Sequence, residues 1–185
     1  MAFKPLKDYR QEQTQRCILA PSLTFKVGDI VGLVGSGSTL YYNTLSNHAT
    51  YTVGAVYPIG VLVGFSKANG EVIGGGQDPL NTPNTLTTLS TNLTVDKYYG
   101  VFLPITMTME WIGDLGAASG TTAYSDQPYA YFQLTDCRTI TETSAVAASN
   151  VASTSQILSL GVNPQNSSQV FCKIIKSSWT RDYTG

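Results

Sequence analysis

Short apolar runs, separated by glycine, serine and asparagine, fill the chain from Phe25 to Phe65. They are rich in β-branched and aromatic residues and comprise Asp29–Val34, Thr39–Asn43, Tyr51–Tyr57 and Ile59–Phe65. A strand commonly has about four to eight residues, whereas a helix needs about ten or more, so each run has the length of a strand. Glycines inside the runs, such as Gly60 and Gly64, suit the bulges of a strongly curved sheet. The pattern predicts a small β-barrel, whose core we place at residues 25–95.

The same pattern of short runs continues to the end of the chain. Asn69-Gly70 predicts a hairpin turn after Phe65. Residues Ile105–Ile112 alternate between apolar and polar side chains, which predicts a half-buried strand. Further strands are expected at Lys97–Leu103, Pro128–Leu134, Gln156–Leu160 and Gln169–Ile175. We therefore expect an all-β protein in which residues 96–185 add strands that complete or extend the barrel and end in a C-terminal tail.

Residues 1–24 are polar and charged, and they show no clear period. Two interpretations fit this composition: a disordered tail, or an extended N-terminal arm that becomes ordered on a partner. Tyr9 and the run Cys17–Ala20 give the segment apolar side chains to bury, which favours the arm. The first residues lack the apolar core of a signal peptide.

Charge is scarce and unevenly distributed. Of the 185 residues, 12% are charged, about half of the usual quarter, which favours a neutral surface packed against something. Residues 1–16 and residues 173–182 each carry a net charge of +2, whereas the residues between them carry −5. Basic ends on an acidic body favour docking onto an acidic neighbour or a sister subunit, with solvated termini as the alternative.

The same composition argues against two classes of partner. No basic stripe is dense enough to predict nucleic-acid binding. No run approaches the roughly 20 apolar residues of a membrane helix. We therefore expect neither nucleic acid nor membrane as a partner.

Candidate catalytic and metal-binding residues are few. His48 is the single histidine and has no neighbouring cysteine or carboxylate, so it does not make a typical zinc site. Glu110 and Asp114 could meet as a pair of carboxylates, but a solvated strand face explains them better. The three cysteines are scattered, and we expect reduced, buried thiols. We predict no catalytic residue, no cofactor site and no metal site, and hence a protein that is not an enzyme.

Two motifs carry a resemblance to a known family. The sequence VGDIV at Val27–Val31 is followed, after a polar stretch, by YPIGVLVG at Tyr57–Gly64. This layout resembles the small β-barrel decoration (cement) proteins of tailed-bacteriophage capsids, in which a strand of the pattern GD-hydrophobic precedes an IGV strand. The resemblance implies a virion protein, assembled in the host cytoplasm, that binds the outside of an assembled capsid and stabilises it. It also implies the major capsid protein as partner and a homo-oligomer, most often a trimer.

The two basic ends supply the expected contacts with the shell or a sister subunit. These partner-binding residues are Tyr9, Arg10, Arg16, Lys173, Lys176, Trp179 and Arg181. One alternative is a head-fibre base, tail or baseplate component of a virion. Another is a carbohydrate-binding β module that uses the tyrosines Tyr41, Tyr42, Tyr98, Tyr99, Tyr129 and Tyr131. Adjacent strand residues point to opposite faces, so a Tyr-Tyr pair does not form one stacking platform, and packing is the better explanation.

Overall fold

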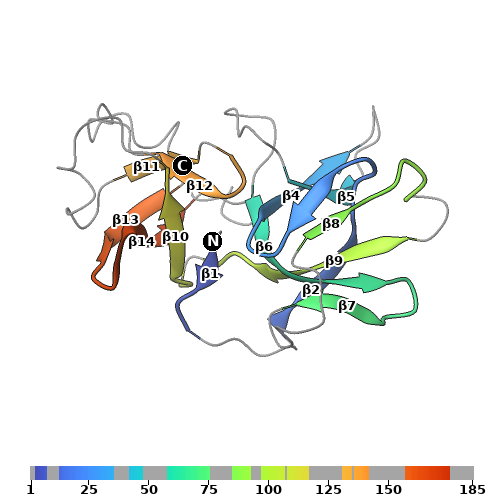
Figure 1. Cartoon of the computed structure of the whole chain (residues 1–185), viewed down its shortest axis with the longest axis horizontal. Helices are drawn as coiled ribbons and strands as arrows, with labels where there is room; N and C mark the ends of the chain where they lie inside the picture. The colour runs from blue at the N-terminus through green and yellow to red at the C-terminus, as the bar shows by residue number, and fades with distance from the viewer. Residues whose placement is uncertain are drawn as a thin grey trace, which may run out of the picture.

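The computed structural model describes fourteen β-strands (Figure 1). The described residues are 3–7, 13–35, 42–47, 58–75, 85–92, 97–106, 108–116, 131–134, 136–141 and 157–175. None of them lies in an α-helix, and the all-β class predicted from the sequence is confirmed. The described part of the chain accordingly holds no helix of the length and apolar character that would cross a membrane.

The first sheet has an open strand order. It runs β2 (Gln15–Ile18), β9 (Tyr98–Pro104), β6 (Pro58–Lys67), β4 (Ile30–Gly35) and β5 (Tyr42–Ser46), and β7 (Val72–Gly75) pairs with β6 at the side. All of these pairs are antiparallel. The two ends of the sheet meet at one isolated bridge, between Leu19 and Leu45. The barrel predicted for residues 25–95 is therefore a curled sheet that is not closed by strand pairing.

Strand β6 is the centre of the first sheet and is buried except for its last residue, Lys67. Its pairing skips Ile59 opposite β4 and Val63 opposite β9, so each is an extra residue in a bulge. Successive side chains of the strand point to opposite faces, so the strand serves two cores, and the bulge at Val63 turns Phe65 to the same face as Leu62. Val63 packs into a cluster shared with the second sheet, whereas Leu62 and Phe65 pack on the opposite side.

The second sheet is formed mainly by the second half of the chain, on the left of Figure 1. Its order is β1 (Lys4–Pro5), β10 (Trp111–Leu115), β12 (Thr139–Thr141), β11 (Tyr131–Leu134), β13 (Ile157–Asn163) and β14 (Asn166–Ile174). Strands β10 and β12 are parallel, and the other pairs are antiparallel. Strand β14 also pairs with β10. Strands β10, β12, β11, β13 and β14 therefore form a closed ring of pairings.

Two hydrophobic cores separate three layers. The first core joins the two sheets and includes Ile30, Val61 and Leu103 with Trp111, Phe132 and Val170. The second core lies on the other face of the first sheet and includes Leu19, Phe25, Leu45, Leu62, Phe65 and Phe102. A two-stranded ribbon of β3 (Thr24–Lys26) and β8 (Thr85–Thr87) contributes Phe25 and Leu86 to it. The first sheet is thus covered on both faces.

The N-terminal segment predicted as an arm is extended, but its described parts belong to the chain's own sheets. Strand β1 pairs with β10 of the second sheet, and β2 pairs with β9 of the first. Phe3 and Leu19 are core residues with exposures of 2% and 0%. Strand β9, which begins after residue 96, is paired with β6 of the same sheet.

The strand predicted at Ile105–Ile112 is wrong. Strand β9 ends at Pro104 and β10 begins at Trp111, and between them the chain turns, with Met109 N donating to Thr106 O at 3.1 Å. Ile105 and Trp111 still belong to the first core, and Met109 packs against it. The alternation of apolar and polar residues therefore predicted which of these described side chains are buried, but the turn interrupts the strand.

Candidate docking surface

The VGDIV motif forms the turn between β3 and β4. Gly28 has a φ of 92°, which side chains of L residues rarely adopt, so the turn requires glycine there. Asp29 N donates to Lys26 O at 2.9 Å, and the Asp29 carboxylate accepts a hydrogen bond from Lys26 N at 2.8 Å. These two bonds fix the direction of a carboxylate that is completely buried.

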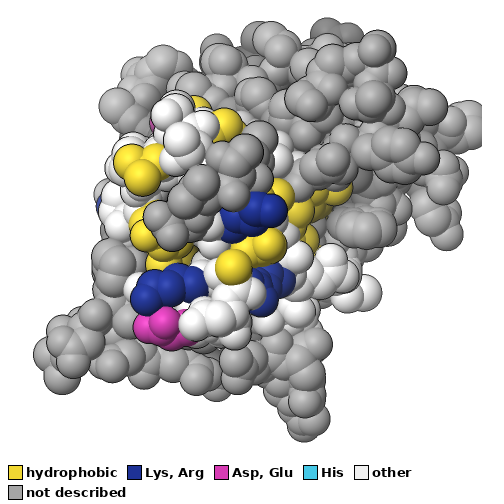
Figure 2. Space-filling view, turned by 90° about the vertical axis from the view of Figure 1, so that its right-hand side faces the viewer, with side chains coloured by type: hydrophobic (Ala, Val, Ile, Leu, Met, Phe, Trp, Pro, Cys, Tyr) yellow, Lys and Arg dark blue, Asp and Glu magenta, His cyan; other side chains and the backbone are white. Residues whose placement is uncertain are grey.

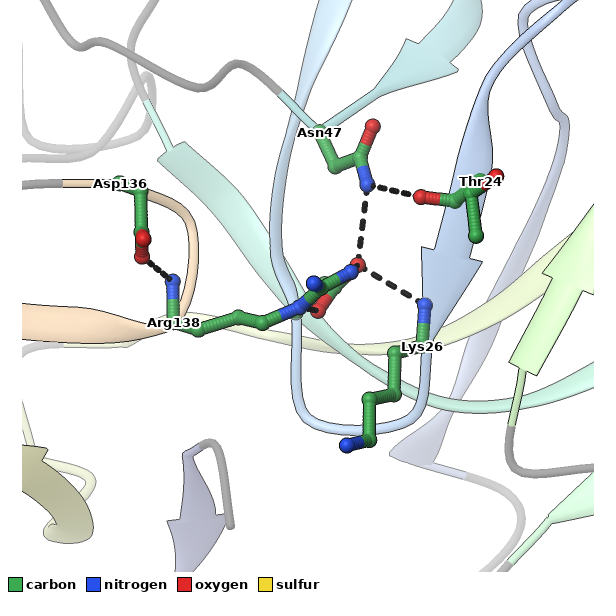
Figure 3. A network of polar contacts seen from close by, with 6 residues as sticks. Thr24, Lys26, Asn47, Asp136 and Arg138 are labelled. Carbon is green, nitrogen blue, oxygen red and sulfur yellow. Dashed lines mark hydrogen bonds and ion pairs between the residues drawn. The ribbon is translucent and has the colours of Figure 1, made fainter.

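The Asp29 carboxylate joins the two sheets (Figure 3). Arg138, in the turn before β12, donates from Nε to Oδ1 and from an NH2 group to Oδ2, the latter at 2.9 Å. Asn47, which follows β5, donates from Nδ2 to Oδ2 at 3.0 Å. Asp136 Oδ1 accepts the Arg138 backbone N–H at 2.7 Å, an Asx turn that orients the arginine. The hydrogen bond to Asp29 raises the pKa of Arg138, so this side chain stays charged.

The two motifs of the family resemblance lie side by side in the first sheet. Ile30 is paired with Val61 and Val31 with Gly60. A Cβ at Gly60 would lie 2.8 Å from the Leu103 carbonyl oxygen and would also overlap the Phe102 ring. The glycine of the IGV motif is therefore required by close packing against β9.

Arg16, the first of the predicted partner-binding residues that the structure describes, ties β2 to the turn between β6 and β7. Its guanidinium lies 4.1 Å from the centroid of the Tyr99 ring. Its NH2 group donates to Lys67 O and, at 3.1 Å, to Ala68 O. Stacking and two hydrogen bonds thus hold an exposed arginine in one place.

A hollow of about 350 Å³ lies beside this arginine. It is lined by Lys67, Ala68, Asn69, Lys97 and Tyr98, and we call it the basic hollow. Lys67 Nζ forms an ion pair with Glu71 Oε2 at 3.0 Å, and this hydrogen bond lowers the pKa of Glu71. Figure 2 shows lysine and arginine side chains on this end of the molecule, with hydrophobic side chains between them and an acidic one beside them.

The other predicted contact residues are not gathered at this surface. Lys173 is a half-buried residue of β14, opposite Leu158 of β13, and therefore belongs to the second sheet. Figure 1 shows β14 and β2 apart from each other, so Lys173 and Arg16 do not form one surface. The remaining predicted residues, Tyr9, Arg10, Lys176, Trp179 and Arg181, lie outside the described residues.

Lys67 and Lys97 were missed by the sequence prediction. They are 30 positions apart in the chain, and the pairing of Lys67 with Tyr98 between β6 and β9 brings them together. No local pattern marked them, because they meet only through the pairing of β6 with β9.

The candidate catalytic and metal-binding residues are dispersed. Within the described ranges, no three side chains of His, Cys, Asp or Glu lie close enough to hold a metal ion. His48 is outside those ranges. Asp114 accepts a hydrogen bond from Gln169 Nε2 at 2.9 Å across β10 and β14, whereas Glu110 lines a different hollow before β10.

The three cysteines, all described, form no disulfide with one another. Cys137 and Cys172 are buried, and burial raises the pKa of each thiol to about 12. Burial also raises the pKa of Cys17. Thiols of this kind stay protonated at neutral pH and are poor nucleophiles and poor metal ligands.

The tyrosines proposed for carbohydrate stacking are only partly described. One face of the Tyr99 ring is covered by Arg16, so that face is not open to a sugar. Tyr98 lines the basic hollow. Tyr41 and Tyr129 lie outside the described residues, and nothing is described of the side chains of Tyr42 and Tyr131.

Comparison of the chain with protein-family models, with curated proteins and with solved structures finds no match.

Proposed function

We propose that this chain is a structural protein of a phage virion that binds the outer surface of the assembled capsid and stabilises it. The pairing of the two resemblance motifs supports this proposal most directly. The GD strand and the IGV strand are neighbours in one sheet, with Ile30 opposite Val61. Gly28 is required by its positive φ and Gly60 by close packing. Motifs that meet in space are stronger support than motifs that are only similar in sequence.

The rigidity of the body also suits adhesion. Two cores and the buried Asp29 carboxylate fix the layers before any partner arrives. Because binding costs free energy for every group that must become ordered, a preformed surface retains more of its contact energy as affinity. The partner would be the major capsid protein, and a trimer would let each subunit contribute one weak contact to a strong combined one.

Binding to capsids is the direct test. The purified chain is mixed with undecorated capsids, assembled from purified phage major capsid protein, and the particles are sedimented. We expect saturable co-sedimentation and a higher temperature of capsid disruption, because the bound chain stabilises only the assembled shell. Binding to purified tails or fibres instead would favour the alternative of a head-fibre base, tail or baseplate component. No binding to any virion part would refute the proposal.

The contribution of the N-terminal segment needs point substitutions. Deleting residues 1–20 would remove β1, β2 and the core residues Phe3 and Leu19, so the protein would not stay folded. The paired substitutions Tyr9→Ala and Arg10→Ala avoid this loss. We expect them to weaken capsid binding without changing the midpoint of thermal unfolding, and unchanged binding would exclude these two residues from the interface.

A further inference from the structure

The basic hollow concentrates positive charge on a protein whose net charge is −1. Lys67 and Lys97 line it, and Arg16 lies next to it because it is bonded to Lys67 O and Ala68 O. Glu71 is the acid that is paired here, through Lys67. Three cations against one acid leave this place positive, although the chain as a whole is slightly negative.

Much of this charge is not used by the fold. Within the described residues, Lys97 Nζ forms no ion pair or hydrogen bond, and the Nε and NH1 groups of Arg16 donate no hydrogen bond. Arg16 is nevertheless held by stacking on Tyr99. A fixed guanidinium with unused donors is suited to a carboxylate, since little side-chain freedom is lost on binding.

The size and charge of the hollow select among anions. A volume of about 350 Å³ is at the small end for a ligand pocket and suits one or two side chains better than a polymer. Nucleic acid is bound by extended basic stripes, whereas this site is small and is lined by only two lysines. A second hollow, of about 360 Å³, is lined by both Lys7 and Glu110, so its opposite charges give no such preference.

We propose that the basic hollow binds glutamate or aspartate side chains on an acidic protein surface. Arg16 and Lys97 would pair with the carboxylates, and Tyr98 and the stem of Lys67 would contact their aliphatic parts. For the identity of the partner, the capsid shell, this inference rests on the proposed function. The chemistry of the hollow does not depend on it.

A short acidic peptide tests the chemistry without any capsid. A hexaglutamate peptide is titrated into the full chain and followed by NMR. We expect chemical-shift changes at Lys67, Asn69, Lys97 and Tyr98, and an affinity that falls as salt is added. Lys97→Glu replaces an attraction by a repulsion and should weaken binding about tenfold. Lys4→Glu, the same exchange on β1 of the second sheet, should leave it unchanged.

Three outcomes would overturn the inference. The shift changes could lie elsewhere, Lys97→Glu and Lys4→Glu could weaken binding equally, or a DNA oligonucleotide or heparin fragment of the same charge could bind more tightly at the hollow. The fold of each variant is checked by its unfolding midpoint. Because Lys97 is half-exposed, we expect no change in that midpoint.

Capsid binding of the same two variants separates this inference from the proposed function. If the wild-type chain binds capsids and Lys97→Glu weakens this binding while Lys4→Glu does not, both stand. If the wild-type chain and Lys97→Glu bind capsids equally, the capsid is not the acidic partner of the hollow, and the proposed function survives. If the peptide binds in the hollow but capsids do not bind, the proposed function fails and the acidic partner is another protein.

Discussion

Ser22 has a φ of 58°, a left-handed conformation that is unfavourable for a residue with a side chain. It follows Pro21 in the turn that leads from Ala20 to Leu23, where a type II turn places glycine. Thr88 keeps the strained turn in place, because its hydroxyl group accepts from Leu23 N at 3.1 Å and lies 2.7 Å from Ala20 O.

Replacing this serine should change stability in a direction set by the new side chain. Ser22→Gly removes the strain but frees the unfolded chain, so we expect a net stabilisation of about 0.5 kcal/mol. Ser22→Val adds a β-branched side chain at a positive φ and should cost about 1 kcal/mol or more. Urea unfolding of the two variants measures both effects, and equal stability of glycine and valine at this position would contradict the assigned backbone conformation.

The buried thiols predict how stability depends on alkaline pH. Burial raises the pKa of Cys137 and Cys172 from an ordinary 9.0 to about 12. Between these values the unfolded chain has lost protons that the folded chain keeps, so the free energy of unfolding falls as pH rises from 9 towards 12. The contribution of the thiols is complete below pH 9.

Urea unfolding at several pH values from 8 to 11 measures this slope. In Cys172→Ala one of the two thiols is absent, so its stability should decline less steeply with pH than that of the wild type. Lysine and tyrosine side chains titrate in the same range, but they contribute equally to both proteins. Parallel curves would show that the Cys172 thiol does not keep its proton in the folded state.

At the scale of elements, the contact between β6 and β9 leaves no space at Gly100. A Cβ added there would lie 2.7 Å from Leu62 Cδ2 and 2.9 Å from methyl groups of both Leu19 and Leu45. Leu62 lies on β6, Leu45 lies on β5 and Leu19 directly follows β2, so the glycine sits where three parts of the first sheet converge. Its small size lets the sheet curl.

Gly100→Ala should therefore destabilise the protein by about 1–3 kcal/mol through overpacking of the second core. Thermal and urea unfolding measure the loss. Leu62→Ala removes one of the clashing methyl groups, so the two substitutions together should cost less than the sum of their separate effects. Strict additivity would mean that Gly100 and Leu62 do not compete for the same space.

Sequence patterns predicted some elements well and others not at all. The apolar runs predicted β4 and β6, and Asn69-Gly70 predicted the hairpin turn, where Gly70 has a φ of 88° and Gly70 N donates to Lys67 O at 3.0 Å. Strand β1 escaped prediction because Lys4–Pro5 has no apolar pattern and is a strand only through its pairing with β10. Local patterns of apolar and polar residues predict which side chains are buried, whereas pairing with distant residues decides where strands begin and end.

The candidate site also depends on pairing between distant residues. Arg16 was expected at an interface from the charge of its segment. Lys67 and Lys97 belong to the acidic middle of the chain, so no charge pattern marked them. They meet Arg16 only through the register of β6 and β9 and the order of the first sheet. A site assembled from three strands is visible only after those strands are paired.

At the scale of the whole molecule, Asp29 and Arg138 connect the two sheets across 109 positions of sequence. Asp29 is fully buried, whereas the Arg138 side chain is 38% exposed. Backbone bonds reinforce the connection, since Ile30 N donates to Cys137 O at 2.8 Å. The loss of one partner would leave the other charge without its counterion.

Two single substitutions and the double variant measure how much the Asp29–Arg138 ion pair contributes to the free energy of unfolding. Arg138→Met leaves a buried carboxylate without its counterion and should cost about 3 kcal/mol. Asp29→Asn should cost a similar amount, because it removes the charge that the arginine binds. The double variant should lose clearly less than the sum of the two, by about 1–3 kcal/mol. Urea unfolding of the four proteins completes the cycle.

A matched control is available in the exposed pair Lys67–Glu71, whose side chains are 47% and 54% exposed. Lys67→Met should change stability by less than about 1 kcal/mol, since solvent screens the pair. If Arg138→Met lowered the free energy of unfolding no more than Lys67→Met does, the Asp29–Arg138 ion pair would not help to hold the two sheets together.

The placement of the first two strands has a consequence for synthesis of the protein. Strand β1 finds its partner at residues 111–112, and β2 finds its partner at residues 99–102. During synthesis, β1 and β2 must therefore stay unpaired until the residues that form β9 and β10 have been made. Neither sheet can be finished while translation is at an early stage. Nascent chains halted before residue 98 should accordingly remain sensitive to protease, whereas released full-length chains should resist it.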